Sequence, residues 1–208
     1  MSTSSAHERA SKSRSYRLGR RAEKQQETRR RIVEAAIELH GTIGPARTTV
    51  AEIAGRAGVQ RHTYYAHFPA ERDLMLACSG LAMERDPLPD PEQWAVLPPG
   101  ADRIRDGLHA LYDWYHRNQN LAACVFRDAE IHALTREVTE LRMAPAFRLI
   151  RESLGKGLSD DERILLDLAL QFDCWRRLCT SLDSGAAANL MVRAIAGAGT
   201  RGQSSSSS

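Results

Sequence analysis

The segment from Thr48 to Phe68, which reads TTVAEIAGRAGVQRHTYYAHF, constrains the fold of this chain more than any other. It divides at Gly58 into two short stretches with helical periodicity. In the first stretch Thr48 or Thr49 suits the N-cap position, because a hydroxyl can accept a free backbone N–H. Apolar residues then follow on one helical face: Val50, Ile53, Ala54 and Ala57. The first stretch is therefore predicted to be a short amphipathic helix.

The glycine turn and the residues after it predict a second helix that crosses the first. Gly58 can adopt the left-handed conformation that ends a helix, and Val59 can fill the corner between two crossing helices. The second helix, residues 60–67, carries polar and aromatic side chains in quick succession: Arg61, His62, Thr63, Tyr65 and His67. Two helices joined in this way form a helix-turn-helix, whose second helix enters the major groove of DNA. The pattern indicates a DNA-binding protein.

The whole register of this segment is more specific than its glycine turn. It reads T-x-x-x-I-A-x-x-A-G-V-x-x-x-T-x-Y-x-H-F and resembles the TetR family of bacterial transcriptional regulators. It matches at Thr49, Ile53, Ala54, Ala57, Gly58, Val59, Thr63, Tyr65, His67 and Phe68, with Leu74 beyond. The preceding RRRIVEAAIELHGTIG is similar to the first helix of the family and its closing glycine. The resemblance is specific over residues 29–76 and only architectural over the rest of the chain.

The N-terminal end of the second helix is the end that faces base edges in this motif. Arg61 is the favoured base reader, with a guanine O6/N7 contact as its expected role and a phosphate contact as the alternative. His62 either reads a base or points at the DNA backbone. The resemblance implies that Thr63 approaches a base or its methyl group, while Tyr64 and Phe68 pack the small core of the head.

The phosphate contacts are also expected near this helix. The resemblance implies that Tyr65 and His67 contact phosphates. Thr49 is expected to serve a phosphate through its hydroxyl and the N-terminus of its helix. Arg47, just before it, is a further candidate for a phosphate contact.

Two residues depart from the family pattern. Glu71 stands where the family has a lysine close to a DNA phosphate, and a carboxylate cannot make that contact. The adjacent Arg72 is a possible substitute. Gln60 stands where the family favours Ser or Thr, so the recognition helix lacks its usual N-cap.

Charge is distributed unevenly along the chain, although the net charge is only +3. The first 31 residues contain 10 Lys/Arg and 3 Asp/Glu, a net of +7. Such an arm attracts phosphates and releases counterions on binding. For the first dozen residues a disordered or solubilising tail is the favoured interpretation. For residues 17–31, contact with a groove or the DNA backbone and a solubilising tail are equal alternatives.

The chain is predicted to be all-α, with an N-terminal three-helix helix-turn-helix DNA-binding head and a C-terminal helical-bundle domain for ligand binding and dimerisation. The expected divisions are a disordered basic arm (1–21), the head (22–68), a connecting helix (69–86), a Pro-rich loop (87–100), the effector-binding and dimerisation domain (101–198) and a disordered tail (199–208). The first helix is expected from about Glu23 to His40. The prolines of residues 87–100 are expected to exclude a helix and to leave a loop or lid that carries Trp94.

The sequence also predicts helix limits in the second domain. Pro145 either kinks the helix of residues 134–154 or starts a new one. A capping box at Ser159–Glu162 starts a further helix, which is expected to continue through Cys179. A final alanine-rich helix then follows Gly185.

Aromatic residues in the second domain are candidates for an effector pocket. They are Tyr112, Trp114, Tyr115, Phe126, Phe147, Phe172 and Trp175. A core position is favoured for any single one, whereas apolar walls with few polar anchors are typical of small-molecule pockets. Trp114 lies off the apolar stripe of its helix and is the least easily explained as core. Arg127, Asp128 and Glu130 are possible anchors for a charged ligand, with solvated helix surface as the favoured interpretation.

The last two helices are expected to form the interface of a homodimer, as they do in the TetR family. The candidate interface residues are Leu168, Phe172, Trp175, Cys179, Leu190 and Ile195. Two copies of this helix pair related by a two-fold axis form a four-helix bundle. Each head then reads one half of a palindromic operator.

The sequence favours a regulator over an enzyme. It lacks HExxH, GxSxG and glycine-rich phosphate-binding motifs. His109, Asp113 and His116 share one helical face at a spacing compatible with a metal, but a solvated face is favoured and neither a metal nor a cofactor is expected. The four cysteines, Cys78, Cys124, Cys174 and Cys179, show no CxxC spacing and are expected to be reduced core residues.

The resulting prediction is a cytoplasmic repressor, without a secretory signal or membrane span, that binds a palindromic double-stranded operator as a dimer. A small-molecule effector is expected to release it. A helix-turn-helix protein without an effector is the first alternative, and a helical enzyme is the second.

Overall fold

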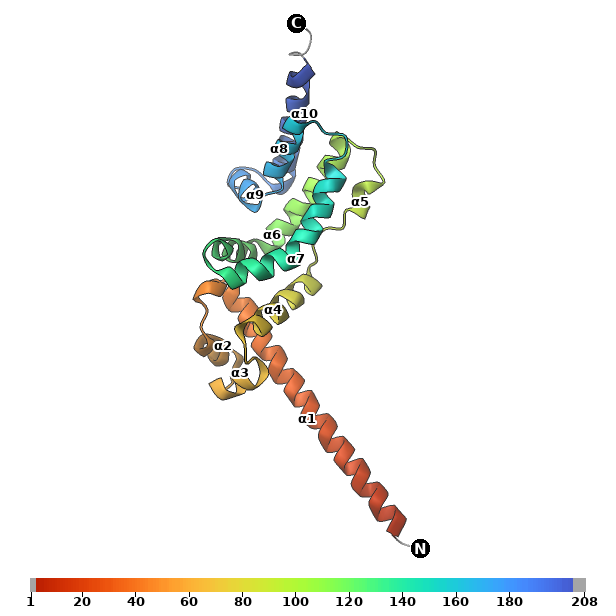
Figure 1. Ribbon diagram of the computed structural model, residues 1–208, viewed down its shortest axis with the longest axis vertical. Helices are drawn as coiled ribbons and strands as arrows, with labels where there is room; N and C mark the ends of the chain where they lie inside the picture. The colour runs from red at the N-terminus through yellow and green to blue at the C-terminus, as the bar shows by residue number, and fades with distance from the viewer. Residues whose placement is uncertain (1–2, 204–208) are drawn as a thin grey trace.

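The computed structural model describes the backbone of residues 3–203 and the side chains of residues 19–199, and every regular element in these ranges is helical. The elongated molecule has the N-terminal helix at one end and the last helix at the other (Figure 1). The elements are α1 (Thr3–His40), η1 (Pro45–Arg47), α2 (Val50–Ala57), α3 (Arg61–His67), α4 (Glu71–Arg85), α5 (Glu92–Ala95), α6 (Ala101–Ile131), α7 (Ala133–Leu154), α8 (Asp160–Ala169), α9 (Phe172–Leu178) and α10 (Ser184–Gln203). The all-α prediction is confirmed.

The turn between α2 and α3 has the predicted geometry. Gly58 ends α2 in the left-handed region, at φ 63° and ψ 40°, and the N–H of Val59 donates to the carbonyl of Ala54 at 2.9 Å. Thr49 is the N-cap of α2 and forms a capping box with Glu52. These local signals fix where α2 begins and ends, and hence where α3 starts.

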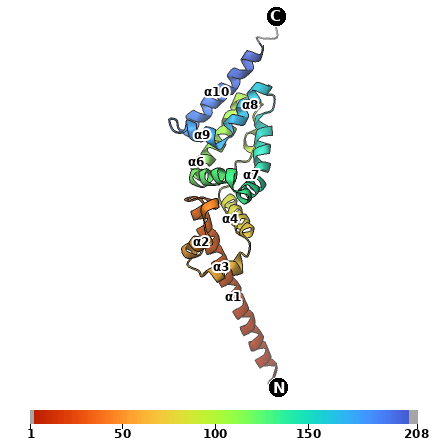
Figure 2. The same cartoon turned by 60° about the vertical axis from the view of Figure 1, so that its left-hand side comes forward.

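One apolar cluster holds the head together, where α1 to α4 lie side by side (Figure 2), and it extends to Val138 of α7 in the next domain. It contains Ile32, Val33, Ala35 and Ala36 of α1, Ile53, Ala54 and Ala57 of α2, Tyr64 and Phe68 at α3, Leu74, Met75 and Cys78 of α4, and Val138 of α7. The expected core positions of Tyr64 and Phe68, which are 2% and 1% exposed, are confirmed. Because α4 contributes to this cluster, the linking helix is packed into the head instead of merely following it.

The ends of the chain differ from expectation in their helix limits. α1 begins at Thr3, well before the expected start near Glu23, and α10 runs to Gln203. The arm is rich in Ser and Arg and contains no proline, so no residue in it excludes a helix, although serine and Gly19 have lower helix propensity than alanine. Residues 1–2 and 204–208 of the expected arm and tail lie outside the described residues.

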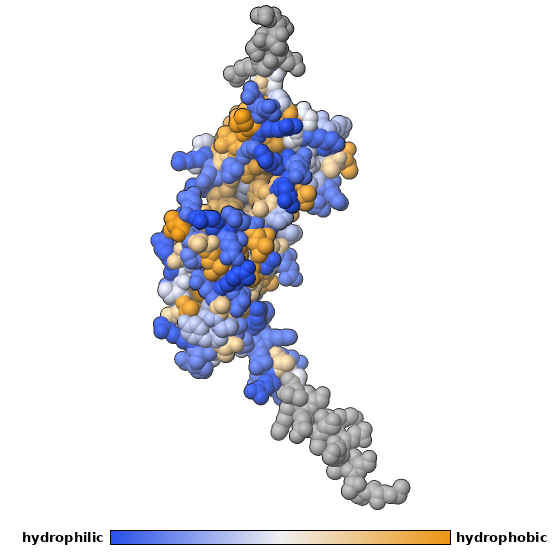
Figure 3. Space-filling view, in the orientation of Figure 1, coloured by the Kyte–Doolittle hydropathy of each residue, from blue (hydrophilic) through white to orange (hydrophobic). Residues whose placement is uncertain are grey.

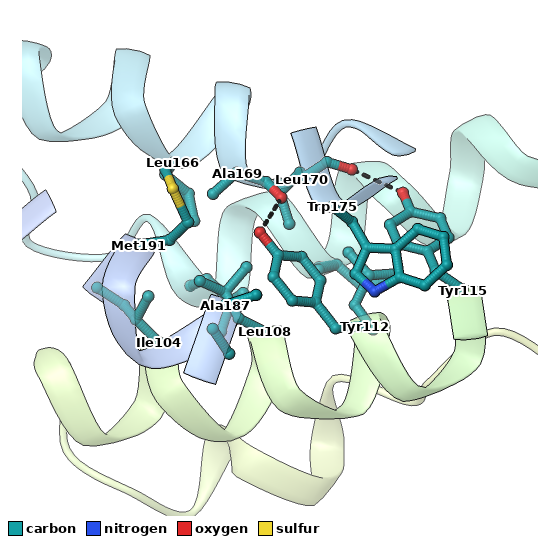
Figure 4. Packing of buried hydrophobic residues seen from close by; sticks show 14 of the residues in the cluster. Ile104, Leu108, Tyr112, Tyr115, Leu166, Ala169, Leu170, Trp175, Ala187 and Met191 are labelled. Carbon is teal, nitrogen blue, oxygen red and sulfur yellow. Dashed lines mark hydrogen bonds between the residues drawn. The ribbon is translucent and has the colours of Figure 1, made fainter. Parts of the chain in front are cut away.

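A second apolar cluster forms the core of the bundle made by α6 to α10. α6 contributes Ile104, Leu108, Leu111, Tyr112 and Tyr115, and α10 contributes Ala187, Ala188, Met191, Val192 and Ile195 (Figure 4). The small alanines let α10 approach α6 closely. α7 and α8 cover the remaining sides through Ile150, Leu154 and Leu166.

The expected helix from Ser159 to Cys179 is wrong in one respect, because it is broken into α8 and α9 at Leu170 and Gln171. Two buried tyrosines of α6 account for the break. The hydroxyl of Tyr112 donates to the carbonyl of Ala169 at 2.9 Å, and that of Tyr115 donates to the carbonyl of Leu170 at 2.7 Å (Figure 4). Burial raises the pKa of both phenols, so both remain donors. They satisfy carbonyls that a continuous helix would satisfy itself.

We expect Tyr112→Phe and Tyr115→Phe each to lower the free energy of unfolding by about 1–2 kcal/mol, because each leaves a buried carbonyl without its donor. Urea unfolding followed by circular dichroism measures the change. Tyr65→Phe, at a tyrosine that is 52% exposed, is the matched control and should leave the midpoint unchanged. A wild-type midpoint for both buried variants would show that the hydroxyls do not stabilise the break.

The Pro-rich segment contains a helical turn, contrary to the expectation that it excludes one. Pro91 precedes α5, so the turn itself contains no proline. Trp94 of α5 is 1% exposed in the bundle core. The buried Arg103 of α6 donates to the carbonyls of Leu97 and Ala95 and holds the segment against the bundle. Of the two alternatives for Pro145, no new helix starts there, because α7 continues to Leu154.

Candidate nucleic-acid interface and apolar pocket

The recognition helix α3 presents one polar face to solvent and one aromatic face to the head. Arg61, His62 and Tyr65 are exposed, whereas Thr63 and His67 are half-buried. The Oγ1 of Thr63 lies 3.3 Å from the Nε2 of His62. Gln60 makes no side-chain capping bond to α3, as expected from its departure from the family pattern. The exposed face therefore carries three of the residues that the sequence predicts to contact DNA.

The remaining predicted DNA contacts lie at the start of α2. Arg47 ends η1 and Thr49 caps α2. The hydroxyl of Thr49 lies 2.7 Å from the Oε2 of Glu52, and the backbone N–H of Thr49 donates to that oxygen at 2.8 Å. These hydrogen bonds lower the pKa of Glu52. Thr49 is therefore engaged in its capping box in this state, and its phosphate contact remains a prediction.

Two arginines of α1 support the helix-turn-helix, and sequence analysis did not single them out. Arg31 donates to the carbonyl of Ala57 and, at 3.1 Å, to that of Gly58, which are the last carbonyls around the turn. The guanidinium of Arg29 lies over the ring of Phe68, 4.5 Å from its centroid. Both residues fix the angle between α1 and the reading helices. Their only signal in the sequence is that they lie in a basic run next to the motif.

The position of Glu71 and Arg72 bears on the departure from the family pattern. Arg72 forms an ion pair with Glu137 of α7 at 2.8 Å, so its guanidinium is directed to the bundle. Glu71 lies 4.0 Å from the Nε2 of His132. In this state neither residue replaces the lysine, and compensation through Arg72 would first require the loss of its ion pair.

An apolar pocket lies where the head meets the bundle. Its cavity volume is about 90 Å³, and it opens in part to solvent. Its walls come from α1, η1, α4, α6 and α7, and include Ile37, His40, Met75, Cys78, Ala82, Met83, Trp114, Leu121, Ala122, Val125, Phe126, Val138, Arg142 and Met143. α4 therefore forms one wall of the pocket and also packs into the head.

The predicted ligand-binding aromatic residues lie in two places, the pocket and the bundle core. Trp114 and Phe126 line the pocket. Tyr112, Tyr115, Phe172 and Trp175 are buried in the bundle core, and Phe147 is half-buried against that core. A ligand role for any of the seven remains a prediction, with its best geometrical support at the first two.

The ionisable groups that line the pocket are largely neutral or compensated. Ion pairing with Arg117, at 3.0 Å, and a bond from Asn118 lower the pKa of Asp86, whose carbonyl also accepts the indole N–H of Trp114. Burial lowers the pKa of His40 to about 4 and raises that of Cys78 to about 12. At neutral pH His40 and Cys78 are therefore uncharged, with His40 Nδ1 3.6 Å from Cys78 Sγ.

Asp128 is not on a solvated helix surface, contrary to the favoured interpretation. It is 1% exposed, and its Oδ2 accepts the backbone N–H of Ala46 at 2.9 Å. Arg127 pairs with it at 2.7 Å and donates to the carbonyl of Ile43 at 3.0 Å. At Gly44, with φ 98°, an added Cβ would collide with both side chains. α6 thus grips the segment that leads into α2, and of the three proposed anchors Asp128 alone is buried.

The predicted interface residues are also divided. Leu168 and Leu190 are 51% and 37% exposed, while Phe172, Trp175 and Ile195 are buried within one protomer and Cys179 is half-buried. Ile164, at 65% exposed, adds to the apolar surface of α8. Apolar residues gather at that end of the molecule in Figure 3. The accessible apolar surface of α8 and α10 therefore includes Ile164, Leu168 and Leu190.

Two further observations concern other classes of protein. Within residues 3–203, none of the helices combines the length and the apolar character that crossing a bilayer requires. Among the described side chains, no three His, Cys, Asp or Glu residues are grouped in a way that could hold a metal ion, and this includes His109, Asp113 and His116.

A helix-turn-helix head that a linking helix joins to a helical bundle defines a class of two-domain DNA-binding proteins. Residues 32–78 match the family described as bacterial regulatory proteins, tetR family. The N-terminal domain matches this family over these residues, so the resemblance seen in the sequence is confirmed there. The regulator TtgR of Pseudomonas putida is 47% identical over 58 residues, which are 28% of this chain and 28% of TtgR. The match to this relative therefore spans less than a third of its length.

Solved structures extend the similarity of fold to most of the chain. FadR from Bacillus subtilis, in complex with stearoyl-CoA, has a TM-score of 0.56 at 18% identity and covers 79% of this chain and 96% of its own. A transcriptional regulator from Aquifex aeolicus VF5 has a TM-score of 0.53 at 20% identity and covers 81% of this chain and 97% of its own. At these identities the similarity establishes the fold, a helix-turn-helix head followed by a helical bundle.

Proposed function

We propose that this protein is a ligand-responsive transcriptional repressor that binds a palindromic operator as a homodimer. A small molecule in the apolar pocket releases it from DNA. The observation that carries the proposal is the double role of α4. Met75 and Cys78 of this helix belong to the head core and also line the pocket, so a ligand there contacts the element on which the head is packed.

The mechanism requires two arrangements of the head relative to the bundle. An effector shifts the population only to the extent that it binds the arrangement without DNA more tightly. A ligand between α4 and α6 would displace α4, which carries Leu74 and Met75 of the head core. The recognition helices of the two protomers then lose the spacing that matches successive major grooves.

Dimerisation through α8 and α10 would supply the second head. The exposed Ile164, Leu168 and Leu190 offer apolar surface that a two-fold axis can pair with itself. The structural neighbour FadR was solved in complex with stearoyl-CoA, which supports a small-molecule ligand for a regulator of this fold.

Selection from a random duplex library at moderate salt, followed by sequencing of the bound fragments, tests the proposal. A palindromic consensus supports a dimeric operator reader. Enrichment of no sequence, with binding that disappears on a modest rise in salt, would contradict it, because that behaviour belongs to a basic arm that contacts only phosphates. A consensus whose binding no small molecule relieves would support the alternative without an effector.

We expect Arg61→Ala to weaken operator binding by roughly 1–3 kcal/mol and to relax the preference at one base position, because Arg61 is exposed at the groove-facing end of α3. Fluorescence anisotropy with the selected operator and its single-base variants measures both effects. Arg56→Ala is the control, since Arg56 lies on α2 and pairs with Glu38 at 2.8 Å. An equal loss on all sequences would assign Arg61 to a phosphate.

A further inference from the structure

Arg142 of α7 links the pocket wall to α4. Its Nη2 donates to the carbonyl of Leu76 at 2.9 Å, and its Nε donates to the Oγ of Ser79 at 3.2 Å. Gly80, inside α4, makes room for this contact, because an added Cβ would lie 3.1 Å from Arg142 Nη2. A glycine inside a helix is less favourable than an alanine. Its presence here permits the close approach of the guanidinium.

Arg142 is exposed to solvent at the edge of the pocket, and its charge has no carboxylate partner among the described side chains. Within residues 19–199, no carboxylate forms an ion pair with it, and its two bonds are to neutral oxygens. The acid that lines the same pocket, Asp86, is already paired with Arg117. Since His40 is neutral above its pKa of about 4, the uncompensated charge at the pocket is positive.

We propose that the effector is an apolar molecule with a single carboxylate, which pairs with Arg142 while its apolar body fills the pocket. This inference rests on the proposed function. A carboxylate accepts two parallel hydrogen bonds from a guanidinium and is a stronger acceptor than a carbonyl or a hydroxyl. The body would lie against Met75, Met83 and Met143, whose flexible thioethers adapt to irregular apolar shapes.

The same pairing explains how such a ligand would act on the head. The carboxylate competes for the Nε and Nη2 donors that now hold Leu76 and Ser79. Once they are taken, the polar link between α7 and this part of α4 is lost, and the apolar packing of Val138 and the Arg72–Glu137 ion pair remain. A neutral apolar ligand fills the pocket but leaves the link in place, and a cation meets the unpaired charge of Arg142. The side chain of Arg142 therefore determines both which class of ligand binds and whether the link to α4 is broken.

Three ten-carbon probes with different head groups test the proposal: decanoate, 1-decanol and decyltrimethylammonium. Binding is followed by calorimetry and by intrinsic tryptophan fluorescence, to which Trp114 of the pocket contributes together with Trp94 and Trp175. We expect decanoate to bind at least about tenfold more tightly than decanol, and the cation to bind most weakly. In Arg142→Met the dissociation constants of decanoate and decanol should agree within about threefold. Arg142→Lys keeps the positive charge but lacks the planar pair of N–H donors, so its ratio of the two constants should be intermediate.

Arg148→Met is the matched control, because Arg148 lies on the same helix and does not line the pocket. It should keep the wild-type preference, and circular dichroism verifies that each variant folds. Equal binding of decanoate and decanol to the wild type would overturn the anionic class, while the pocket and the proposed function would stand. If none of the probes binds, the effector role of the pocket fails together with the inference.

Discussion

Asp128→Ala is expected to lower the free energy of unfolding by about 3 kcal/mol. The substitution removes a charged acceptor from the backbone N–H of Ala46, and hydrogen bonds to charged groups contribute about 1.5–3 kcal/mol. It also removes the partner of Arg127, whose guanidinium is 46% exposed, so that ion pair adds only about 0–1 kcal/mol. The N–H of Ala46 would be left without its acceptor. Urea unfolding measures the loss.

Two further variants separate the contributions of Asp128. Asp128→Asn keeps an oxygen acceptor for Ala46 and removes the charge, so it should cost about 1 kcal/mol. Glu130→Ala, on the same helix but exposed, should be neutral within about 0.5 kcal/mol. If Asp128→Ala is as stable as Glu130→Ala, then the contact between Asp128 of α6 and the segment at Ala46 does not stabilise the protein.

The helix-turn-helix could be predicted because its determinants are local. The left-handed Gly58, the Thr49 cap and the apolar period of α2 all lie within ten consecutive residues, and each has one structural meaning. The polar face of α3 follows from the same register. Such a segment specifies its geometry before any tertiary contact is considered.

The pocket and the helix break could not be predicted in the same way, because both are tertiary. The pocket is lined by residues from Ile37 to Met143, which share no sequence pattern. The break between α8 and α9 contains neither glycine nor proline, and its cause is a pair of hydroxyls more than fifty residues away, at Tyr112 and Tyr115. The apolar periodicity of the sequence continues across this break and therefore does not predict it.

Asp128 shows how a single polar residue misleads sequence analysis. On an amphipathic helix with several acids, each acid is expected at the surface. The burial of this one depends on the loop at Gly44, which lies more than eighty residues earlier and lacks a Cβ at the point of contact. Only the packed structure distinguishes it from Glu130, which is exposed.

His40 should make the protein less stable as the pH falls from 7 to 4. Burial lowers its pKa to about 4, against the influence of Asp128, so the folded protein takes up this proton only near pH 4. In the unfolded chain the same imidazole takes up its proton near its ordinary pKa of about 6.5. Between these values the unfolded state binds more protons, so the free energy of unfolding decreases as the pH decreases. The loss is about 2 kcal/mol by pH 5 and about 3 kcal/mol by pH 4.

Urea unfolding between pH 7.5 and 5 isolates this effect. Ordinary carboxyl groups titrate mostly below that range, and the acids with ion pairs here, such as Glu34 and Asp86, have pKa values lowered further. His40→Met replaces the imidazole with an apolar side chain and should flatten the pH dependence, whereas His116→Gln, at an exposed histidine, should not. Equal slopes for the wild type and His40→Met would mean that water reaches His40 and protonates it in the folded state. Because His40 lines the pocket and contacts Cys78 of α4, a flattened slope would also show that this junction is dry when no ligand is bound.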